Sequence, residues 1–295
     1  MSHFTVLVTG DHESALQPFH EFECTGANDA FVVSVDQTED LRAQHADHVK
    51  GDGDGEYPLF RDYLTSYHEV PLVPHGAQPD TDGEHKFGYA TLDDAGEVTS
   101  VFRRTNPNAK WDWWQVGGRW RGKLLTKAGE RVDQAFAGDI DWSGMVASTC
   151  KDAGATFDKI HAVIGTREVV SWAQTLARKD AGEFDIEGAR AFYNGQEAVK
   201  ELIRREAIDS WDGASTLSKV LAATDRESYV KLEGETNATT FAMLHDGKWY
   251  ERGSMGWFGM SSDTPESTAD YATQFWEIAR ALPPATPVTV VDCHI

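Results

Sequence analysis

The sequence predicts an α+β fold in which a mixed or antiparallel sheet holds the N- and C-terminal strands in its core and helices pack on it. Runs rich in β-branched residues at His3–Val8 and at 286–295 predict a strand at each end of the chain. Strand and helix patterns alternate irregularly between them, which favours a layered α+β fold over repeated βαβ units. The first turn, TGDHES, has one glycine where a dinucleotide-binding fingerprint needs three, which disfavours a Rossmann fold.

The elements between the two ends follow from residue spacing and turn signals. Apolar residues at helical spacing predict helices, and turns rich in glycine and aspartate between β-rich runs predict hairpins. A Thr-Pro-Glu sequence, typical of a helix N-terminus, begins the last predicted helix. The predicted elements are a strand at 31–35, helices at 38–50, 59–68, 169–179 and 187–208, hairpins turning at 93–96 and 245–247, and a helix at 264–282.

With 295 residues and 40% hydrophobic content, the chain can bury a substantial core without disulfides. We expect a single domain over residues 1–295 with a helical insertion around 165–225. The apolar runs are shorter than the roughly 20 residues that a membrane-spanning helix needs, and the first residues lack a signal-peptide pattern. Three widely spaced cysteines fit a reducing compartment. We therefore expect a cytoplasmic protein with no membrane partner.

The chain carries 48 acidic and 27 basic residues, for a net charge of −21. Repulsion between this charge and phosphate groups disfavours coating of duplex DNA or of an anionic membrane. The same charge suits a well-solvated surface, a binder of basic proteins or a mimic of nucleic acid. Composition alone does not choose between these three.

Basic residues are concentrated in one segment, Arg103–Lys127, which holds seven cations and one acid. A basic segment in an acidic chain predicts a site for a small nucleotide or phosphate ligand, because repulsion elsewhere discourages polymers. Indoles can stack on a base, a Gly-Gly pair lets backbone N–H groups approach a phosphate, and arginine binds phosphate through two hydrogen bonds. The predicted ligand-binding residues are Lys110, Trp111, Trp113, Trp114, Gly117, Gly118, Arg119, Trp120 and Arg121.

A structural role is the alternative for this segment. Trp111 and Trp113 are two residues apart, so in a strand they would point to one face and could join the core. The arginines would then form surface ion pairs. Whether these side chains line an open pocket or lie in the core and in ion pairs separates the two interpretations.

The two chain ends supply a second candidate site. If the first and last strands pair antiparallel, His3 comes close to Asp292 and His294, and these three residues are predicted to hold a divalent metal such as zinc. Neighbouring residues in a strand point to opposite faces, so Cys293 and His294 would not easily reach one ion together. The alternative is a set of buried polar residues with hydrogen-bond partners at a sheet edge.

Three shorter patterns carry weaker signals. His3-Phe4-Thr5-Val6 fits half of the pattern of two-histidine phosphoesterases, but the second copy is missing, since the sequence at His161 continues with alanine and valine. The loop GDGDGEYP lacks the spacing of an EF-hand calcium loop and predicts an acidic turn. The aromatic residues of MGWFGM are predicted to pack against the Trp-rich segment.

Four stretches resemble a family of tailed-phage and prophage proteins that is frequent in actinobacterial phages. They are MSHFTVLVTG, NPNAKWDWWQVGGRW, DGKWYERGSMGWFGM and TVVDCHI, and the spacing K-W-D-W-x-x-x-G-G-R-W is specific. The family has no assigned activity, so the resemblance implies a phage origin and a shared architecture and carries over no catalytic residue. Accessory phage genes of this sort often act on host proteins or sequester signalling nucleotides, which would place the protein in the cytoplasm of the host cell.

These observations lead to three functional hypotheses. The first is a non-enzymatic phage accessory protein that binds a small anionic or nucleotide ligand or a host protein, and thereby counters a host defence. The second is a metal-dependent phosphoesterase or nucleotide hydrolase that uses His3, Asp292 and His294. The third is a virion or assembly component. The sequence does not specify the oligomeric state.

Overall fold

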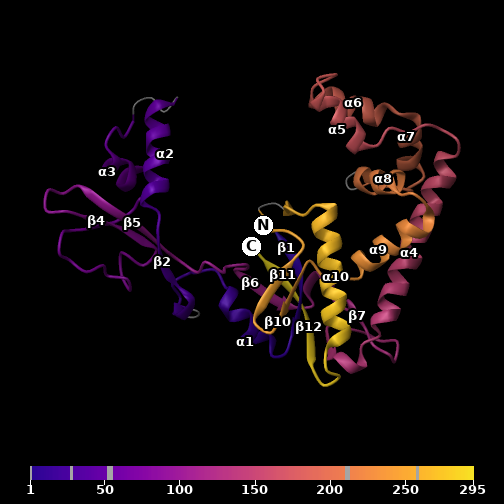
Figure 1. The fold of residues 1–295 in the computed structure, drawn as a ribbon, viewed down its shortest axis with the longest axis horizontal. Coiled ribbons are helices and arrows are strands. Elements are labelled where there is room, and N and C mark those ends of the chain that lie inside the picture. Colours follow the sequence, from indigo (N-terminus) through magenta and orange to yellow (C-terminus); the bar gives the residue numbers. More distant parts are fainter. Residues whose placement is uncertain (1, 27–28, 52–55, 210–212, 257–258) are drawn as a thin grey trace. The chain divides into compact units, whose positions relative to one another are not determined.

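The computed structural model describes residues 2–26, 29–51, 56–209, 213–256 and 259–295, and its helices and strands confirm the α+β fold (Figure 1). The chain divides into two compact units. The first unit contains Asp11–Trp114 and Cys293–Ile295, and the second contains Ser2–Gly10 and Gln115–Asp292. The one domain expected over residues 1–295 thus consists of two units, and the expected helical insertion belongs to the second.

The first unit is built on a four-stranded sheet. Its elements are α1 (His12–Leu16), β2 (Val33–Asp36), α2 (Thr38–Lys50), α3 (Phe60–Asp62), a π-helical turn (Tyr63–Tyr67), β3 (Leu72–Val73), β4 (Gly88–Leu92) and β5 (Val98–Thr105). The strand order is β2-β5-β4-β3. In the β4–β5 hairpin, the carboxylate of Asp93 accepts hydrogen bonds from two turn N–H groups, as expected for an aspartate in a tight turn. Leu41 of α2 packs with Ala90 and Val101 of this sheet.

A six-stranded mixed sheet forms the centre of the second unit, and only Trp113, Trp114, Cys293 and His294 at the ends of its strands belong to the first. Its strands are β1 (His3–Thr9), β6 (Trp113–Val116), β9 (Gln134–Phe136), β10 (Ala242–His245), β11 (Lys248–Glu251) and β12 (Pro287–His294). Their order is β11-β10-β1-β12-β6, with β9 also paired to β12. β12 runs antiparallel to β1, because the Gly10 N–H donates to the Pro287 carbonyl at one end and His3 meets Asp292 at the other. The two terminal strands are therefore neighbours.

Helical connections and short strands complete the second unit. They are β7 (Leu124–Leu125), β8 (Arg131–Val132), α4 (Trp142–Ile164), α5 (Trp172–Asp180), α6 (Ile186–Gly195), α7 (Glu197–Arg204), α8 (Gly213–Ala222), α9 (Arg226–Asn237) and α10 (Pro265–Ala281). β1 and β10 are parallel, so the chain needs a crossover between them, and α4 to α9 form the last part of that connection. Phe275 of α10 packs against Leu7, Met243 and Val290 of the sheet.

The helices of the crossover differ from the prediction in two places. Residues 187–208 form two helices instead of one, and the break lies at Gln196, whose side chain bonds to the backbone N–H and carbonyl of Val170. The longest helix, α4, was not predicted from the sequence. It packs closely on α9, where the Thr149 hydroxyl donates to the Gly234 carbonyl at 2.6 Å.

Within the described residues, no helix is both long and apolar enough to cross a membrane. Two interpretations from the sequence lie outside the described residues. They are the acidic turn at residues 52–55 and the packing of Trp257 and Phe258.

Gly234→Ala tests whether close helix contact stabilises the crossover. A Cβ atom at this position would lie 2.2 Å from the Cys150 Sγ atom, so α4 and α9 would have to separate. We expect the free energy of unfolding to fall by about 1–3 kcal/mol, as is typical of overpacking. Urea denaturation measures this, with Gly195→Ala as the control, because a Cβ there meets nothing within 4 Å and alanine favours a helix. Equal stability of the two variants would contradict the expectation.

Candidate functional site

A cavity of about 200 Å³ lies in the second unit. It is bounded by the start of β1, the turn that follows β6, the end of α9 and the residues around the β10–β11 hairpin. The charged or titratable residues that line it are His3, Lys123 and Arg252, and none of the described lining residues is acidic. In a chain with a net charge of −21, this cavity is therefore a local concentration of positive charge.

Lys123 is partly buried beside two other cations. Its Nζ atom donates to the Asn237 carbonyl at 3.3 Å, and its own carbonyl accepts from Arg131 at 3.4 Å. Burial lowers the pKa of the Lys123 ammonium to about 8, and repulsion from Arg252 and Arg131 acts in the same direction. An anion in the cavity would relieve this repulsion.

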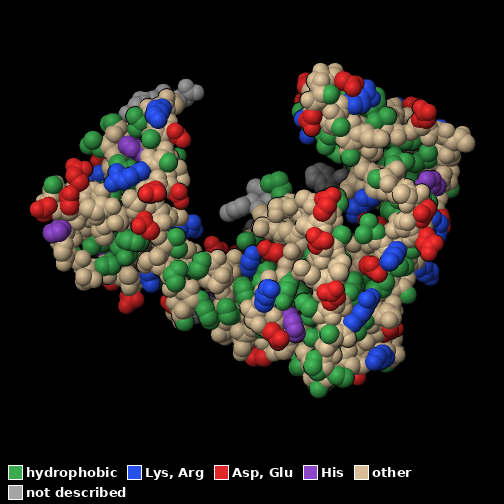
Figure 2. Space-filling view, viewed as in Figure 1, with side chains coloured by type: hydrophobic (Ala, Val, Ile, Leu, Met, Phe, Trp, Pro, Cys, Tyr) green, Lys and Arg blue, Asp and Glu red, His purple; other side chains and the backbone are tan. Residues whose placement is uncertain are grey.

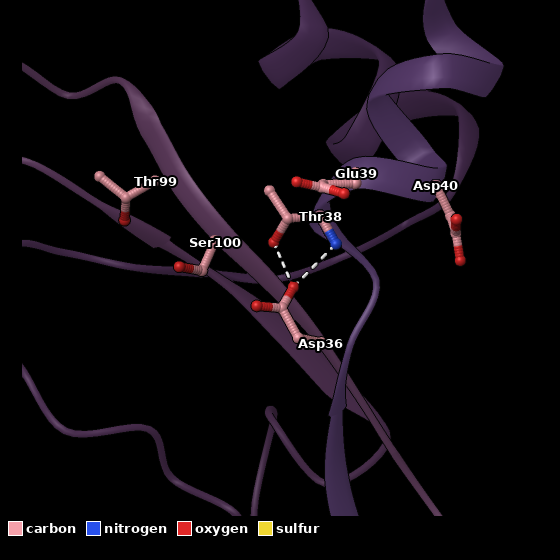
Figure 3. Close-up of a pocket in the computed structure, with 6 residues that line it drawn as sticks. All are labelled: Asp36, Thr38, Glu39, Asp40, Thr99 and Ser100. Carbon is pink, nitrogen blue, oxygen red and sulfur yellow. Dashed lines mark hydrogen bonds between the residues drawn. The ribbon is translucent and has the colours of Figure 1, made fainter.

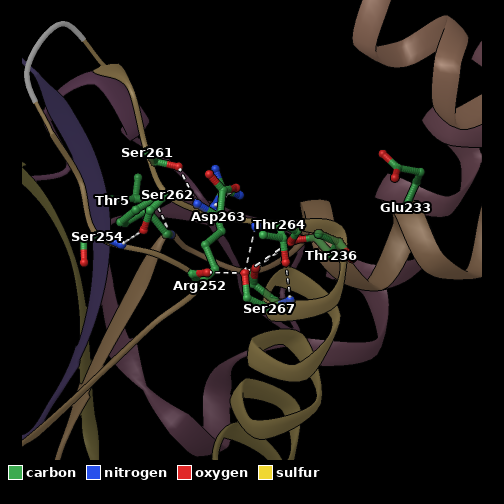
Figure 4. A network of polar contacts seen from close by, with 12 residues as sticks. Thr5, Glu233, Thr236, Arg252, Ser254, Ser261, Ser262, Asp263, Thr264 and Ser267 are labelled. Carbon is green, nitrogen blue, oxygen red and sulfur yellow. Dashed lines mark hydrogen bonds and ion pairs between the residues drawn. The ribbon is translucent and has the colours of Figure 1, made fainter. Parts of the chain in front are cut away.

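Arg252 follows β11 and is held by the start of α10 (Figure 4). Its carbonyl accepts a hydrogen bond from the Ser267 hydroxyl at 2.7 Å, and Ser267 forms a capping box with Thr264 at the N-terminus of α10. Its Nε atom lies 3.3 Å from a carboxylate oxygen of Asp263, and its guanidinium lies over the ring of Phe241. The Nε atom is buried and has no hydrogen-bond partner among the described residues. Arg252 is thus fixed in place, and its buried Nε–H group forms no hydrogen bond with a described residue.

His3 is oriented by a carboxylate that is fully buried. The Nδ1 atom of His3 lies 2.8 Å from Asp292, whose side chain has no exposed surface. The second oxygen of Asp292 accepts the backbone N–H of Arg119 at 3.0 Å. A buried carboxylate requires such partners, since an unpaired one is strongly destabilising. The pairing fixes the ring of His3 at the wall of the cavity.

The Gly117-Gly118 pair brings the backbone close to two carboxylates. Both glycines have positive φ, and a Cβ atom would lie 2.4 Å from Asp133 at Gly117 and 2.3 Å from Asp292 at Gly118. The sequence predicts that the close approach that glycine permits serves a bound phosphate. In the structure, the protein's own carboxylates occupy both places, so the glycines are needed to position Asp292 and hence His3.

Other side chains that line the cavity are aromatic or already donate hydrogen bonds within the protein. Trp120 and Phe241 provide apolar surface, which lowers the local dielectric and strengthens interactions between charges. The Thr239 and Thr240 hydroxyls donate to backbone carbonyls at 2.7 and 2.6 Å. Lys123 and Arg252 are therefore the groups best able to donate hydrogen bonds to a guest.

The predicted ligand-binding residues are divided between the two units. Lys110, Trp111, Trp113 and Trp114 belong to the first unit, whereas Gly117 to Arg121 belong to the second. Of the nine, Trp120 lines the cavity. Lys123, which lies inside the basic segment Arg103–Lys127 but is not one of the nine, also lines the cavity.

The tryptophans and arginines of this segment have different environments. Trp111 is buried with 6% of its surface exposed, and its indole N–H donates to the Leu16 carbonyl. Trp113 is 48% exposed, which contradicts a shared core position with Trp111. Arg119 and Arg121 are exposed, and neither forms an ion pair with another described residue. The structural alternative therefore holds for Trp111 and for Trp120, which packs against the core of the sheet, and it does not hold for Trp113, Arg119 and Arg121.

The predicted metal residues form two separate pairs. His3 bonds to Asp292, and His294 bonds to Asp112 at 2.6 Å in the first unit. Among the described residues, no group of three or more His, Cys, Asp or Glu side chains is arranged to hold a metal ion. The predicted antiparallel pairing of the end strands is correct, but it brings one histidine to Asp292 and not two.

A second hollow, of about 500 Å³, lies in the first unit and is acidic (Figure 3). Asp36, Glu39 and Asp40 line it together with hydroxyl residues. The Asp36 carboxylate accepts the Thr38 N–H at 2.9 Å and the Thr38 hydroxyl at 2.5 Å, and these bonds lower its pKa. The Asp36 carboxylate therefore serves the start of α2.

Lys123 and Arg252 were not assigned to the site by the sequence analysis. Lys123 was counted among the seven cations of the basic segment, and that local charge was the signal for it. No pattern in the sequence around Arg252 marks it as a site residue. It lies at the cavity because of the order of the strands in the sheet.

The comparisons with known proteins add no information on the site. No family model, no curated protein and no solved structure matches the chain.

Gly118→Ala tests the role of the glycine pair. The new methyl group would collide with the Asp292 carboxylate, so the contacts of Asp292 with His3 and with the Arg119 N–H should be lost. Gly129→Ala is the matched control, since its φ of +85° imposes similar backbone strain while a Cβ meets nothing within 4 Å. We expect Gly118→Ala to lose about 1–3 kcal/mol more unfolding free energy than the control. Unchanged ring ¹⁵N shifts of His3 would contradict this role.

Lys123→Met tests whether the lysine is retained at the expense of stability. The pKa of about 8 in the folded chain is below the ordinary 10.5, so charging this lysine opposes folding. The loss of folding stability caused by the charge on Lys123 is complete below pH 8. It disappears as the pH rises from 8 to 10.5. Thermal unfolding of the ligand-free protein should show a higher Tm for the variant at pH 7 and a shrinking difference above pH 8. Lys127→Met, at an exposed lysine that also donates to a carbonyl, should show no such pH dependence.

Proposed function

We propose that the protein binds a small anionic ligand of the nucleotide or phosphate class in the cavity formed by Lys123, Arg252, His3 and Trp120. The observation that carries this proposal is the convergence of two cations and a histidine on one cavity without a described acidic lining residue. Ion pairs with phosphate are strong when the donors are partly desolvated, as both are here. A binding role agrees with the non-enzymatic accessory function that the phage resemblance suggests.

The charge distribution favours a compact ligand over a polymer. Figure 2 shows acidic and basic side chains scattered over the visible faces of both units. A net charge of −21 repels nucleic acid at long range, whereas a phosphate inside the cavity interacts mainly with the nearest cations. The cavity therefore supports the ligand-binding form of the hypothesis more directly than the host-protein form. We further propose that binding sequesters a signalling nucleotide of the host cell and so counters a defence.

The proposal is tested by titrating the protein with 5′-AMP and with inorganic phosphate at pH 7. Isothermal calorimetry should give a measurable Kd for wild type, and Lys123→Met and Arg252→Met should each weaken binding by about tenfold or more, the typical effect of losing a charged hydrogen-bond donor. Ligand should also raise the Tm of wild type and not of these variants.

Arg119→Ala and Arg121→Ala are the matched controls, because both side chains are exposed cations outside the lining of the cavity. They should retain wild-type affinity. Loss of binding in Arg119→Ala with full binding in Lys123→Met would assign the ligand to the exposed basic segment instead. Absence of binding to either probe would remove the proposed function.

A further inference from the structure

The charges around the cavity leave an excess of positive charge. Lys123, Arg252 and Arg131 supply three cations when the lysine is protonated, and Asp263 offsets one of them through its ion pair with Arg252. Asp292, the buried partner of His3, adds a second negative charge at the wall. The balance remains positive, and it suits a dianion better than a monoanion, because electrostatic attraction grows with the product of the charges.

The size of the cavity also restricts the ligand. Its volume of about 200 Å³ is below the roughly 300–1,000 Å³ typical of pockets that enclose a drug-sized molecule. A terminal phosphate can be enclosed, while a whole nucleotide would extend beyond the cavity. The indole of Trp120 offers a surface on which the rest of such a ligand can stack.

The hydrogen-bond donors of the cavity match the oxygens of a phosphate. The Nζ atom of Lys123 has one weak bond in the described structure, to Asn237 at 3.3 Å. The Nε atom of Arg252 is buried and forms no hydrogen bond with a described residue, although it lies 3.3 Å from the Asp263 carboxylate. A phosphate oxygen placed between these groups would accept from both and would replace the water that each has lost on burial.

The protonation of Lys123 is coupled to the occupancy of the cavity. Arg252 and Arg131 are the charged groups that repel its proton, and burial disfavours its charge further. A bound dianion reverses the sign of the local potential and favours the ammonium form. His3 also lines the cavity, and its contribution is separated by the variant Lys123→Arg, which keeps His3 and replaces the lysine.

We infer that the cavity binds the terminal phosphate of a phosphate monoester as a dianion, and that Lys123 takes up a proton when the phosphate binds. This inference rests on the proposed function and specifies the ligand class of the same site. It predicts discrimination between ligands with the same base and sugar, since a monoester carries two charges near neutral pH and a diester carries one.

The discrimination is measured with 5′-AMP and 3′,5′-cyclic AMP at pH 8. We expect the monoester to bind about tenfold or more tightly, the ratio that corresponds to about 1.4 kcal/mol. Proton uptake is measured by calorimetry in buffers with different ionisation enthalpies. About half a proton should be taken up per 5′-AMP at pH 8, and the affinity should fall by about fivefold between pH 8 and 9.

Lys123→Arg separates proton uptake from charge. Arginine remains protonated at this pH, so the variant should bind 5′-AMP without proton uptake and with an affinity that is constant between pH 8 and 9. Lys127→Met should behave as wild type in every measurement. If Lys123→Arg fails to fold, the same comparison is made with Lys123→Gln, which should bind more weakly and also lose the pH dependence.

The possible results distinguish the inference from the proposed function. Equal affinity for the two nucleotides, or proton uptake that persists in Lys123→Arg, would overturn the inference while the cavity remained a binding site. Binding of neither nucleotide would overturn both. Preference for the monoester together with proton uptake that depends on Lys123 would support both.

Discussion

The buried carboxylate of Asp292 connects the parts of the second unit that form the cavity. It lies in the last strand, accepts a backbone N–H from the turn after β6, and bonds to His3 at the start of the first strand. A carboxylate with no exposed surface is tolerated only when it is paired in this way. Because Trp120 directly follows the residue that donates this N–H, the same contact positions two walls of the cavity.

Elements with strong local signals could be predicted from the sequence. Helix α2 has the predicted bounds, the turn at Asp93 has the residues that such a turn requires, and α10 begins with a proline after its capping threonine. Helix α4 could not be predicted in the same way. Its surface carries the small residues Gly154 and Cys150, which are poor or middling helix formers, and tertiary contact with α9 compensates for this weakness.

The candidate site was predictable only in part, because a cluster in the sequence need not be a cluster in space. The Trp-rich segment crosses the boundary between the two units, and Trp111 is held in the first unit by its bond to Leu16. The composition correctly indicated a local excess of positive charge. The Gly-Gly pair, however, was compatible with two different neighbours, a bound phosphate or a carboxylate of the protein. A short sequence does not show whether glycine admits a phosphate or a carboxylate of the protein itself; here Asp292 is 174 positions away from Gly118 in the chain.

The proposed binding of an anion is compatible with the acidic charge of the chain. Long-range repulsion from the net charge is screened within about 10 Å at ordinary ionic strength, whereas contacts inside a partly desolvated cavity are screened much less. A ligand small enough to enter the cavity therefore interacts mainly with Lys123 and Arg252. A polymer, by contrast, is repelled by the acidic surface before it reaches the cavity. Burial lowers the pKa of Lys123, and repulsion from Arg252 acts in the same direction. Both effects destabilise the empty cavity, and the anion of the proposed function would relieve them, so a geometry that weakens the fold locally would strengthen binding.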